Sequence, residues 1–493
     1  MSGLAGIISL NKSRKNKRKI NILLDKISHR GEKKESFNIC GNYIGINTNY
    51  DFESRTDKDI ILLDGKIYNL DDLLLKNNIK FESGSISDTK KISILFNSRG
   101  EEIFKEFKGS FALVFADKKG NIYLLRDVIG KKPLYYHKDN RTLIFASEVK
   151  SLIGFTSDIQ EFPPGCCMLN LKSPKRVKKI NMDDYSIIEN PDPEMLEKKL
   201  EDYLFESIDK RISNKNMYFG VWLSGGLDSS IVAALLKEFS ERIYTYSVGI
   251  EDSPDLCSAR EVASYLGTRH TEYKLNIEEL FLSIPKVIYH LESFDAPLVR
   301  SSLGNIIASK ISASSDVVFS GEGGDELFAG YKYFLEFDSS RIIQQELVNA
   351  INSLHNTALQ RVDRIANAYS VNVKLPILDE SLLNFVLRIH PKNKVRKDKN
   401  ISKYILRKVA SKYLPESITW REKDKFWEGS GISNTLDKKI DTMITDDEFI
   451  KRRDLMDDFR LRNKEEAYYY EIFRNYYSDV DINNILSFTQ DFN

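Results

Sequence analysis

Apolar and polar residues alternate in short runs through about the first 180 residues of the chain, and turn-forming residues separate these runs. A period of two is typical of half-buried strands, because successive side chains point to opposite faces of a sheet. The runs that show it are Leu4–Leu10, Tyr43–Asn47, Ile60–Tyr68, Ser110–Ala116, Ile122–Arg126 and Leu143–Ala146. The pattern predicts an N-terminal antiparallel β-sandwich layered with a few helices.

The pattern changes in the second half of the chain, where strand-like apolar runs alternate with helix-like runs. Such an order is typical of βαβ units, and it predicts a C-terminal doubly wound parallel sheet that binds ligands at the carboxyl ends of its strands. We expect strands at Tyr218–Leu223, Ile243–Val248 and Val317–Phe319, and helices at Ile231–Phe239 and Ala259–Leu266.

A polar segment with two prolines, Asp183–Pro193, separates the two patterns, and a charged helical run begins near Glu194. A chain of 493 residues also exceeds what one hydrophobic core usually serves. We therefore expect an α/β protein of two domains, at residues 1–182 and 194–493.

Charge and composition narrow the class of protein. The formal net charge is +1, which gives no reason to expect nucleic acid or a membrane as a partner. Apolar runs are too short to span a bilayer, and the N-terminus lacks the order of a secretory signal, so we expect a cytoplasmic location. The four cysteines and six histidines show no zinc-binding spacing, and we expect reduced, structural cysteines.

The most specific string is SGGLDSS, Ser224–Ser230, which lies between a predicted strand and a predicted helix. A glycine turn at a helix N-terminus presents backbone N–H groups to an anion, so we expect a phosphate cradle with ATP as the ligand. The loop differs from GxxxxGK[ST] because no lysine follows its glycines. An ordinary glycine–serine turn is the alternative. The expected phosphate-binding residues are Ser224, Gly225, Gly226, Asp228, Ser229 and Ser230.

Two other loops, SVGI at 247–250 and SGEGGDE at 320–326, follow strands of the same predicted sheet. The carboxyl ends of parallel strands meet at one edge, so we expect the three loops to form one active site. In this site Leu223 and Val248 would flank an adenine ring, Ser320 and Gly321 would form a second backbone cradle, and Asp228 and Asp325 would hold Mg²⁺.

These strings resemble those of the asparagine synthetases and their amide-forming relatives, and the resemblance covers nearly the whole chain. It implies a glutamine amidohydrolase half of N-terminal-nucleophile type, followed by a synthetase half of ATP-pyrophosphatase type. Beyond SGGLDSS the similar segments, in the order of the family, are Thr245–Tyr273, Tyr289–Ser302, Phe319–Tyr331, Leu375–Asp379, Ile418–Ile432 and Lys464–Phe473.

The resemblance implies two catalytic residues. Glu322 matches the glutamate implicated as the base that deprotonates the attacking amine, where β-lactam synthetases use a tyrosine. Lys423 matches the lysine that stabilises negative charge on the acyl-adenylate and pyrophosphate. From the residues alone, Glu322 could instead cap a helix, and Lys423 could be a solvated surface residue.

The implied reaction is ATP-dependent amide formation. A carboxylate, from aspartate or a related acid, attacks the α-phosphorus of ATP and releases pyrophosphate, and an amine then displaces AMP. The expected requirements are ATP, Mg²⁺, a small-molecule carboxylate and an amine. Asn372 and Lys374 stand where many asparagine synthetases have glutamate and arginine. This departure either alters recognition of the acid, which leaves its identity open, or is a drift at a structural salt bridge.

The glutaminase half departs from the family pattern. Glutamine-hydrolysing members expose an N-terminal cysteine with its own α-amino group as base, whereas this chain has Ser2. Asp64 replaces the asparagine of NGEIYN that helps to build the oxyanion hole, and RGPD reads RGEK at Arg30–Lys33. A hydroxyl is less acidic than a thiol, and a carboxylate opposes a developing oxyanion. We expect this half to lack glutaminase activity, to pack against the synthetase and to shape its pocket.

Several alternatives remain open. The amine could be free ammonia, ammonia from a partner protein, or an amine of the acceptor itself, as in β-lactam synthetases and lasso-peptide cyclases. The chain could also be a glutamine-hydrolysing asparagine synthetase that uses Ser2, or a non-catalytic nucleotide-binding scaffold. A homodimer and a biosynthetic partner protein stay open. We expect the tyrosine-rich stretch at 468–477 to pack in the protein rather than to stack on nucleic acid.

Overall fold

The computed structural model describes residues 2–11, 15–49, 54–56, 59–79, 86–188, 191–214, 216–422, 432–454 and 460–489. The chain forms two compact units. Unit 1 comprises Met1–Ile180 and Tyr477–Ser487, and unit 2 comprises Asn181–Tyr476 and Phe488–Asn493.

Unit 1 contains two antiparallel sheets, with strand orders β2-β3-β1-β8-β7-β9 and β11-β10-β6-β5-β4. The strands of the first sheet are β1 (Ser2–Ser9), β2 (Lys33–Ile39), β3 (Asn42–Thr48), β7 (Tyr135–Lys138), β8 (Thr142–Ala146) and β9 (Gln160–Glu161). Those of the second are β4 (Ile60–Ile67), β5 (Gly109–Ala116), β6 (Ile122–Arg126), β10 (Cys166–Leu169) and β11 (Lys175–Arg176).

Alternation along β4 shows how the layers of unit 1 form. Leu62 belongs to a core cluster that also contains Leu4 and Ile46 of the first sheet, so it packs between the sheets. Ile61 and Leu63 belong to a second cluster, with side chains from the helices that cover the outer face. The expected sandwich layered with helices is therefore confirmed. The helical segments are α1 (Lys15–Asp25), η1 (Ser28–Arg30), α2 (Leu70–Lys76), α3 (Asp88–Arg99), η2 (Gly100–Glu106), α4 (Val149–Leu152) and η9 (Ile482–Asn484).

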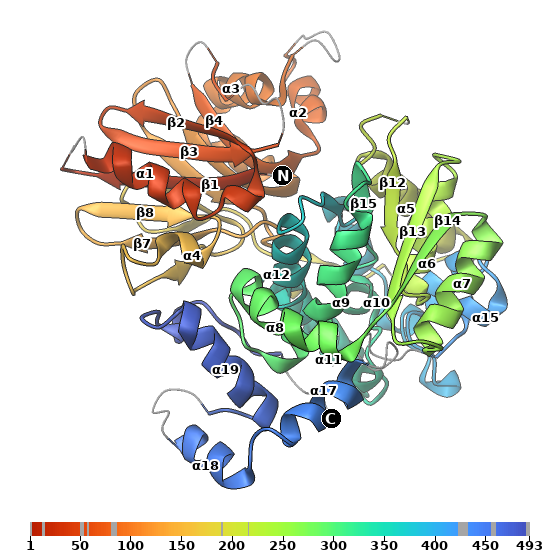
Figure 1. Cartoon of the computed structure of the whole chain (residues 1–493). Helices are drawn as coiled ribbons and strands as arrows, with labels where there is room; N and C mark the ends of the chain where they lie inside the picture. The colour runs from red at the N-terminus through yellow and green to blue at the C-terminus, as the bar shows by residue number, and fades with distance from the viewer. Residues whose placement is uncertain are drawn as a thin grey trace. The chain divides into compact units, whose positions relative to one another are not determined.

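Unit 2 is built on a parallel sheet of order β14-β13-β12-β15-β16, which confirms the fold class expected for the second half. Helices α6 and α7 lie to one side of this sheet and α9 to the other (Figure 1). The strands are β12 (Phe219–Trp222), β13 (Ile243–Gly249), β14 (Arg269–Lys274), β15 (Val317–Phe319) and β16 (Val373–Lys374). The first helices are α5 (Pro193–Asp209), α6 (Leu227–Lys237), α7 (Pro254–Leu266), α8 (Ile277–Leu291), α9 (Ala296–Ser312) and α10 (Gly324–Phe328).

The remaining helical segments of unit 2 are mostly short. They are η3 (Met182–Asp184), η4 (Lys332–Leu335), α11 (Ser340–Ser353), η5 (Leu354–Asn356), α12 (Ala358–Gln360), the π-helix η6 (Arg361–Ile365), α13 (Glu380–Leu387), η7 (Pro391–Asn393), η8 (Lys397–Lys399), α14 (Tyr404–Ala410), α15 (Glu416–Thr419), α17 (Ile432–Asp441), α18 (Asp446–Asp454) and α19 (Lys464–Tyr476).

The strand order places the site of unit 2. The chain runs outward from β12 to β13 and β14, then returns to the other side of β12 with β15 and β16. The order therefore reverses between β12 and β15, and such a switch point opens a crevice at the carboxyl ends of the strands. The segments that follow these two strands are Ser224–Ser230, which runs into the first turn of α6, and Ser320–Gly324, which ends at the start of α10.

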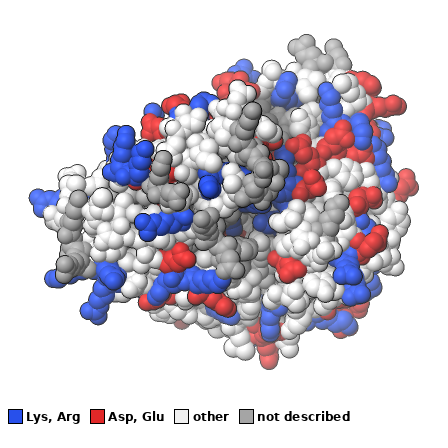
Figure 2. Space-filling model, turned by 90° about the horizontal axis from the view of Figure 1, so that it is seen from above, with Lys and Arg blue, Asp and Glu red and all other residues white. Residues whose placement is uncertain are grey.

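The surface carries both signs of charge. Acidic and basic side chains both occur across the face drawn in Figure 2. Within the described ranges, no helix is both long and apolar enough to cross a membrane.

Candidate functional site

The loop between β12 and α6 is held by its own hydroxyl groups. The Ser224 N–H donates to Ser229 Oγ at 3.2 Å, and the two serine hydroxyls lie 3.1 Å apart. The Gly226 N–H donates to Ser224 Oγ at 3.3 Å, and Ser229 Oγ donates to the Gly226 carbonyl at 3.2 Å. These bonds fix a tight turn at the start of a buried helix, as an anion cradle requires.

The loop after β15 lies directly against the first loop. A Cβ atom on Gly321 would lie 2.5 Å from the backbone of Asp228 and Ser229, and one on Gly324 would overlap the Asp228 carboxylate. Only glycine permits this close approach. The structure therefore brings Asp228, Gly321 and Asp325 together, as the sequence predicts, although these residues follow different strands.

A buried lysine bridges the two aspartates. Lys403 Nζ forms ion pairs with Asp228 and with Asp325, the latter at 2.7 Å, and only 4% of its side chain is exposed. Burial disfavours its charge, but the two carboxylates outweigh burial and raise the pKa of Lys403 above its ordinary value. The backbone of Lys403 has φ of 55°, a left-handed conformation that is uncommon for lysine. Sequence reasoning missed Lys403, which lies 175 residues from Asp228.

Glu322, in the turn between β15 and α10, is held by an arginine of a distant helical segment. Arg361 Nη2 lies 2.6 Å from Glu322 Oε2, and Arg361 Nη1 donates to Asn305 Oδ1 at 3.2 Å. Arg361 begins the π-helix η6, a type of segment that is frequent at functional sites. The Glu322 carboxylate is thus oriented beside the two loops, and only 19% of its side chain is exposed.

A second glutamate near Glu322 was also missed from the sequence. Glu326 is buried in α10 and accepts a hydrogen bond from Tyr331 Oη at 2.6 Å. Burial, together with the negative charges of Asp325 and Glu322, raises the pKa of Glu326 to about 7.

The residues expected around a nucleotide base lie at the ends of β12 and β13. Leu223 and Val248 are both buried, and the Leu223 N–H donates to the Tyr246 carbonyl at 2.9 Å. Ser230 and Ser320 are buried as well. Leu223, Val248 and Ser320 lie at the carboxyl edge of the sheet, and Ser230 lies in the first turn of α6.

Lys423 lies outside the described residues, but the segment before it contacts the phosphate loop. Arg421 Nη1 donates to the Gly225 carbonyl at 3.4 Å, and Arg421 Nη2 pairs with Asp255 at 3.0 Å. Arg407 donates to the Arg421 carbonyl at 3.1 Å. Arg421, which stands two residues before Lys423, therefore contacts the glycine turn.

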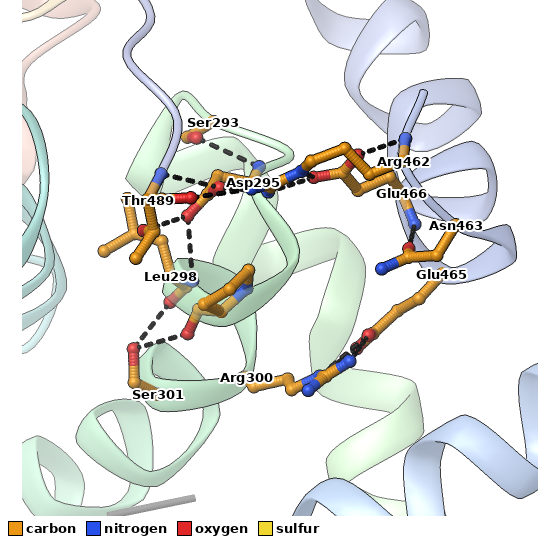
Figure 3. Close-up of polar contacts among 11 residues, drawn as sticks. Ser293, Asp295, Leu298, Arg300, Ser301, Arg462, Asn463, Glu465, Glu466 and Thr489 are labelled. Carbon is orange, nitrogen blue, oxygen red and sulfur yellow. Dashed lines mark hydrogen bonds and ion pairs between the residues drawn. The ribbon is translucent and has the colours of Figure 1, made fainter. Parts of the chain in front are cut away.

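A buried polar cluster joins α9, α19 and the C-terminal segment (Figure 3). Asp295 caps α9 by accepting from the Leu298 N–H, and it also accepts from Thr489 Oγ1 at 2.6 Å and pairs with Arg462 at 2.6 Å. Burial raises the pKa of Asp295 above its ordinary value. On the next turn of α9, Arg300 forms a bidentate pair with Glu465.

The tyrosine-rich stretch packs in part within α19, where Tyr476 is exposed. Tyr469 and Phe473 are fully buried, and Tyr470 and Phe473 make edge contacts with Phe294. All four cysteines are free, and Cys40 and Cys257 are exposed. No group of three or more metal-ligating His, Cys, Asp or Glu side chains occurs among the described residues.

In unit 1 the expected nucleophile position is buried. Ser2 opens β1, and its hydroxyl donates to Thr48 Oγ1 at 3.1 Å. Asp64 lies beside it in β4 and is paired with Arg30 at 3.0 Å, whereas Lys33 is exposed on β2.

Comparisons with known proteins match both units. The asparagine synthase family profile matches residues 199–342 and 336–480, and the glutamine amidotransferase domain profile matches residues 1–163. The chain is 32% identical over 439 residues to asparagine synthetase B [glutamine-hydrolyzing] of Escherichia coli, covering 84% of this chain and 78% of that protein.

Two further relatives show similar coverage. A probable asparagine synthetase [glutamine-hydrolyzing] of Dictyostelium discoideum is 33% identical, with 85% of this chain and 82% of that protein covered. The root asparagine synthetase [glutamine-hydrolyzing] of Pisum sativum is 33% identical, with 85% and 75% covered.

Proposed function

The chain belongs to the asparagine synthase family, and we propose that it is an AMP-forming carbon–nitrogen ligase that adenylates the side-chain carboxylate of aspartate, or of a related acid, and transfers it to ammonia. The observation that carries this proposal is the meeting of two glycine loops at the switch point of the sheet, with Asp228 and Asp325 bridged by Lys403.

The first step joins a carboxylate oxygen to the α-phosphorus and breaks the bond to pyrophosphate. Backbone N–H groups at the start of α6 would bind the phosphates, and the hydroxyls of Ser224 and Ser229 hold that turn through hydrogen bonds. Lys403 adds a positive charge beside this turn. The two carboxylates hold its ammonium group at the two loops.

Asp228 and Asp325 fit a magnesium site. Both supply hard oxygen atoms, and Lys403, which bridges them, would give up these contacts when an ion binds. Mg²⁺ usually takes only one or two protein carboxylates and completes its shell with phosphate oxygens and water. The ion would neutralise charge on the phosphates, and Asp228 and Asp325 would fix its position.

The second step needs a group that accepts a proton from the attacking amine. We assign this role to Glu322, which Arg361 and, through it, Asn305 hold in place. Lys423 is proposed to stabilise negative charge on the acyl-adenylate, since Arg421 brings the preceding segment to Gly225.

We expect the edge strand β16 to help determine which acid is bound. The Ser320 N–H donates to the Lys374 carbonyl at 3.0 Å, and the Val318 N–H donates to the Asn372 carbonyl at 3.0 Å. The two residues that depart from the family pattern therefore flank the Glu322 loop. This placement favours a role in recognising the acid.

A second candidate is glutamine-hydrolysing asparagine synthesis. It is favoured by the relatives, which carry that activity in their names, and by the match of residues 1–163 to the glutamine amidotransferase domain. Against it stand Ser2 at the nucleophile position and the Asp64 carboxylate beside it. We therefore place ammonia first as the nitrogen source.

The test is pyrophosphate release from ATP and Mg²⁺ with L-aspartate, with ammonium, glutamine or neither, and with product masses determined. We expect asparagine, AMP and pyrophosphate with ammonium. Asp325→Asn should abolish turnover, whereas Asp338→Asn, at a fully exposed position, should preserve it. Turnover with glutamine equal to that with ammonium would establish the second candidate. Turnover that does not depend on aspartate would contradict the proposed acid.

A further inference from the structure

The N-terminal strand of unit 1 begins in a fully buried charge network. Arg30 Nε donates to the Ser2 carbonyl at 2.9 Å, and the guanidinium pairs with Asp64 at 3.0 Å and with Glu148 at 2.7 Å. The side chains of Arg30, Asp64 and Glu148 are all 0% exposed. Such a network persists only because each charge has a partner.

The other side of Glu148 is also paired. His29 Nε2 lies 3.0 Å from Glu148, and buried Lys150 forms a further ion pair with it. Burial alone would raise the pKa of Glu148, but His29, Lys150 and Arg30 lower it well below its ordinary value. Glu148 is thus paired with Arg30 and Lys150 and contacts His29, and Asp64 is the carboxylate that contacts the Ser2 nitrogen.

The main-chain nitrogen of Ser2 points at this carboxylate. Its N–H donates to Asp64 Oδ1 at 3.3 Å, while the Ser2 hydroxyl donates to Thr48 Oγ1. In a chain that starts at Ser2, this nitrogen is the α-amino group. An N-terminal nucleophile needs that amine in its neutral form, because the amine must accept the proton of the attacking group.

We propose that Asp64 is an electrostatic lock on the N-terminus: its carboxylate holds the α-amino group of Ser2 as an ammonium ion and so removes the base that glutamine hydrolysis needs. This inference rests on the proposed function, and it gives a reason why ammonia and not glutamine is the nitrogen source. A carboxylate this close favours the charged form of an amine by about 1–3 pKa units. The missing thiol is then only half of the defect, and restoring the thiol alone does not restore the site.

The experiment compares labelling by a chloromethyl ketone analogue of glutamine. The neutral α-amine takes the thiol proton, and the resulting thiolate attacks the chloromethyl carbon, so that a C–S bond forms, the C–Cl bond breaks and chloride leaves. Wild type, Ser2→Cys, Asp64→Asn and Ser2→Cys/Asp64→Asn are made as fusions cleaved directly before residue 2. Every variant then has a free α-amino group. The intact mass shows whether the chain begins at residue 2 and whether the adduct has formed.

We expect adduct formation at residue 2 in the double variant at least roughly 10-fold faster than in Ser2→Cys, because the neutral amine is more populated. Wild type and Asp64→Asn should form no adduct there. Equal rates in Ser2→Cys and the double variant, whether fast or absent, would overturn the proposal.

Two controls separate this test from folding and from the proposed function. Asp64→Asn leaves an amide oxygen for Arg30, and Ser2→Cys/Asp64→Ser serves as a second double variant, with melting curves to confirm that both fold. Ligase activity with ammonium is measured in all variants and should be unchanged, since these residues lie in unit 1. If no variant, including wild type, has ligase activity, the proposed function is refuted. The labelling comparison would still test whether Asp64 holds the α-amino group as an ammonium ion.

Discussion

Lys403 supplies the positive charge that the Ser224–Ser230 loop lacks in its own sequence. We predict that Lys403→Met lowers kcat/KM for pyrophosphate release roughly 100-fold, because Asp228 and Asp325 are left to repel each other and the phosphates. Lys397→Met, which removes a more exposed lysine paired with Asp338, should change it by less than about twofold. A loss below threefold in Lys403→Met, with the fold intact by circular dichroism, would contradict this role.

Glu326 should make stability depend on pH. Its pKa rises from 4.5 to about 7 in the folded state, so the folded chain holds a proton that the unfolded chain releases between these values. The stabilising contribution is complete below pH 4.5 and is lost as the pH rises through about 7. Glu326→Gln, which stays neutral, should therefore gain on wild type as the pH rises from 5 to 8, by on the order of 2–3 kcal/mol. Denaturant unfolding at both pH values measures this, and a constant difference would refute it.

Residues that stand within a recognisable string could be predicted from the sequence, whereas their partners from distant elements could not. Ser224–Ser230, Asp228, Asp325 and Glu322 were predicted because each stands in a recognisable loop. Lys403 and Arg361 were missed because an ion pair between residues far apart in the chain leaves no local signal. The sequence places Glu326 within the motif SGEGGDE but does not reveal its raised pKa, because that shift comes mainly from burial.

At the scale of elements, the end of the chain is predicted to stabilise α9. Thr489 donates to buried Asp295, Arg462 donates to the Thr489 carbonyl at 2.7 Å, and Phe488 contacts Phe294. Removing residues 488–493 leaves Asp295 buried with fewer donors, and we expect the melting temperature to fall by at least about 4 °C. Removing only residues 490–493 is the matched control and should have little effect. Equal melting temperatures for the two truncations would contradict this account.

The elements that the sequence predicted are those with an unambiguous apolar period. Ile122–Arg126 was predicted with the bounds of β6, and Ile60–Tyr68 ends one residue beyond β4. The strand β14 was missed because RHTEYK is polar and lies at the edge of its sheet. The strand β16 has two residues, too few to show any period.

In the whole molecule, we assign ligase chemistry to unit 2 and no nitrogen supply to unit 1. We predict that a mixture of glutamine labelled with ¹⁵N in its amide and unlabelled ammonium gives unlabelled asparagine. The reason is that Ser2 has no thiol and its nitrogen lies beside Asp64. Mass spectrometry of the product measures the incorporation. Asparagine enriched in ¹⁵N, without release of labelled ammonium into solution, would show that unit 1 hydrolyses glutamine.

The central claim is that a carboxylate attacks the α-phosphorus of ATP at the loops Ser224–Ser230 and Ser320–Gly324. The most direct test supplies aspartate labelled with ¹⁸O in its side-chain carboxylate, together with ATP, Mg²⁺ and ammonium, and determines the mass of the nucleotide product. The account predicts that one ¹⁸O atom appears in AMP, because the carboxylate oxygen stays on the α-phosphorus when the amine displaces the nucleotide. Unlabelled AMP, or ADP with ¹⁸O in inorganic phosphate, would contradict it.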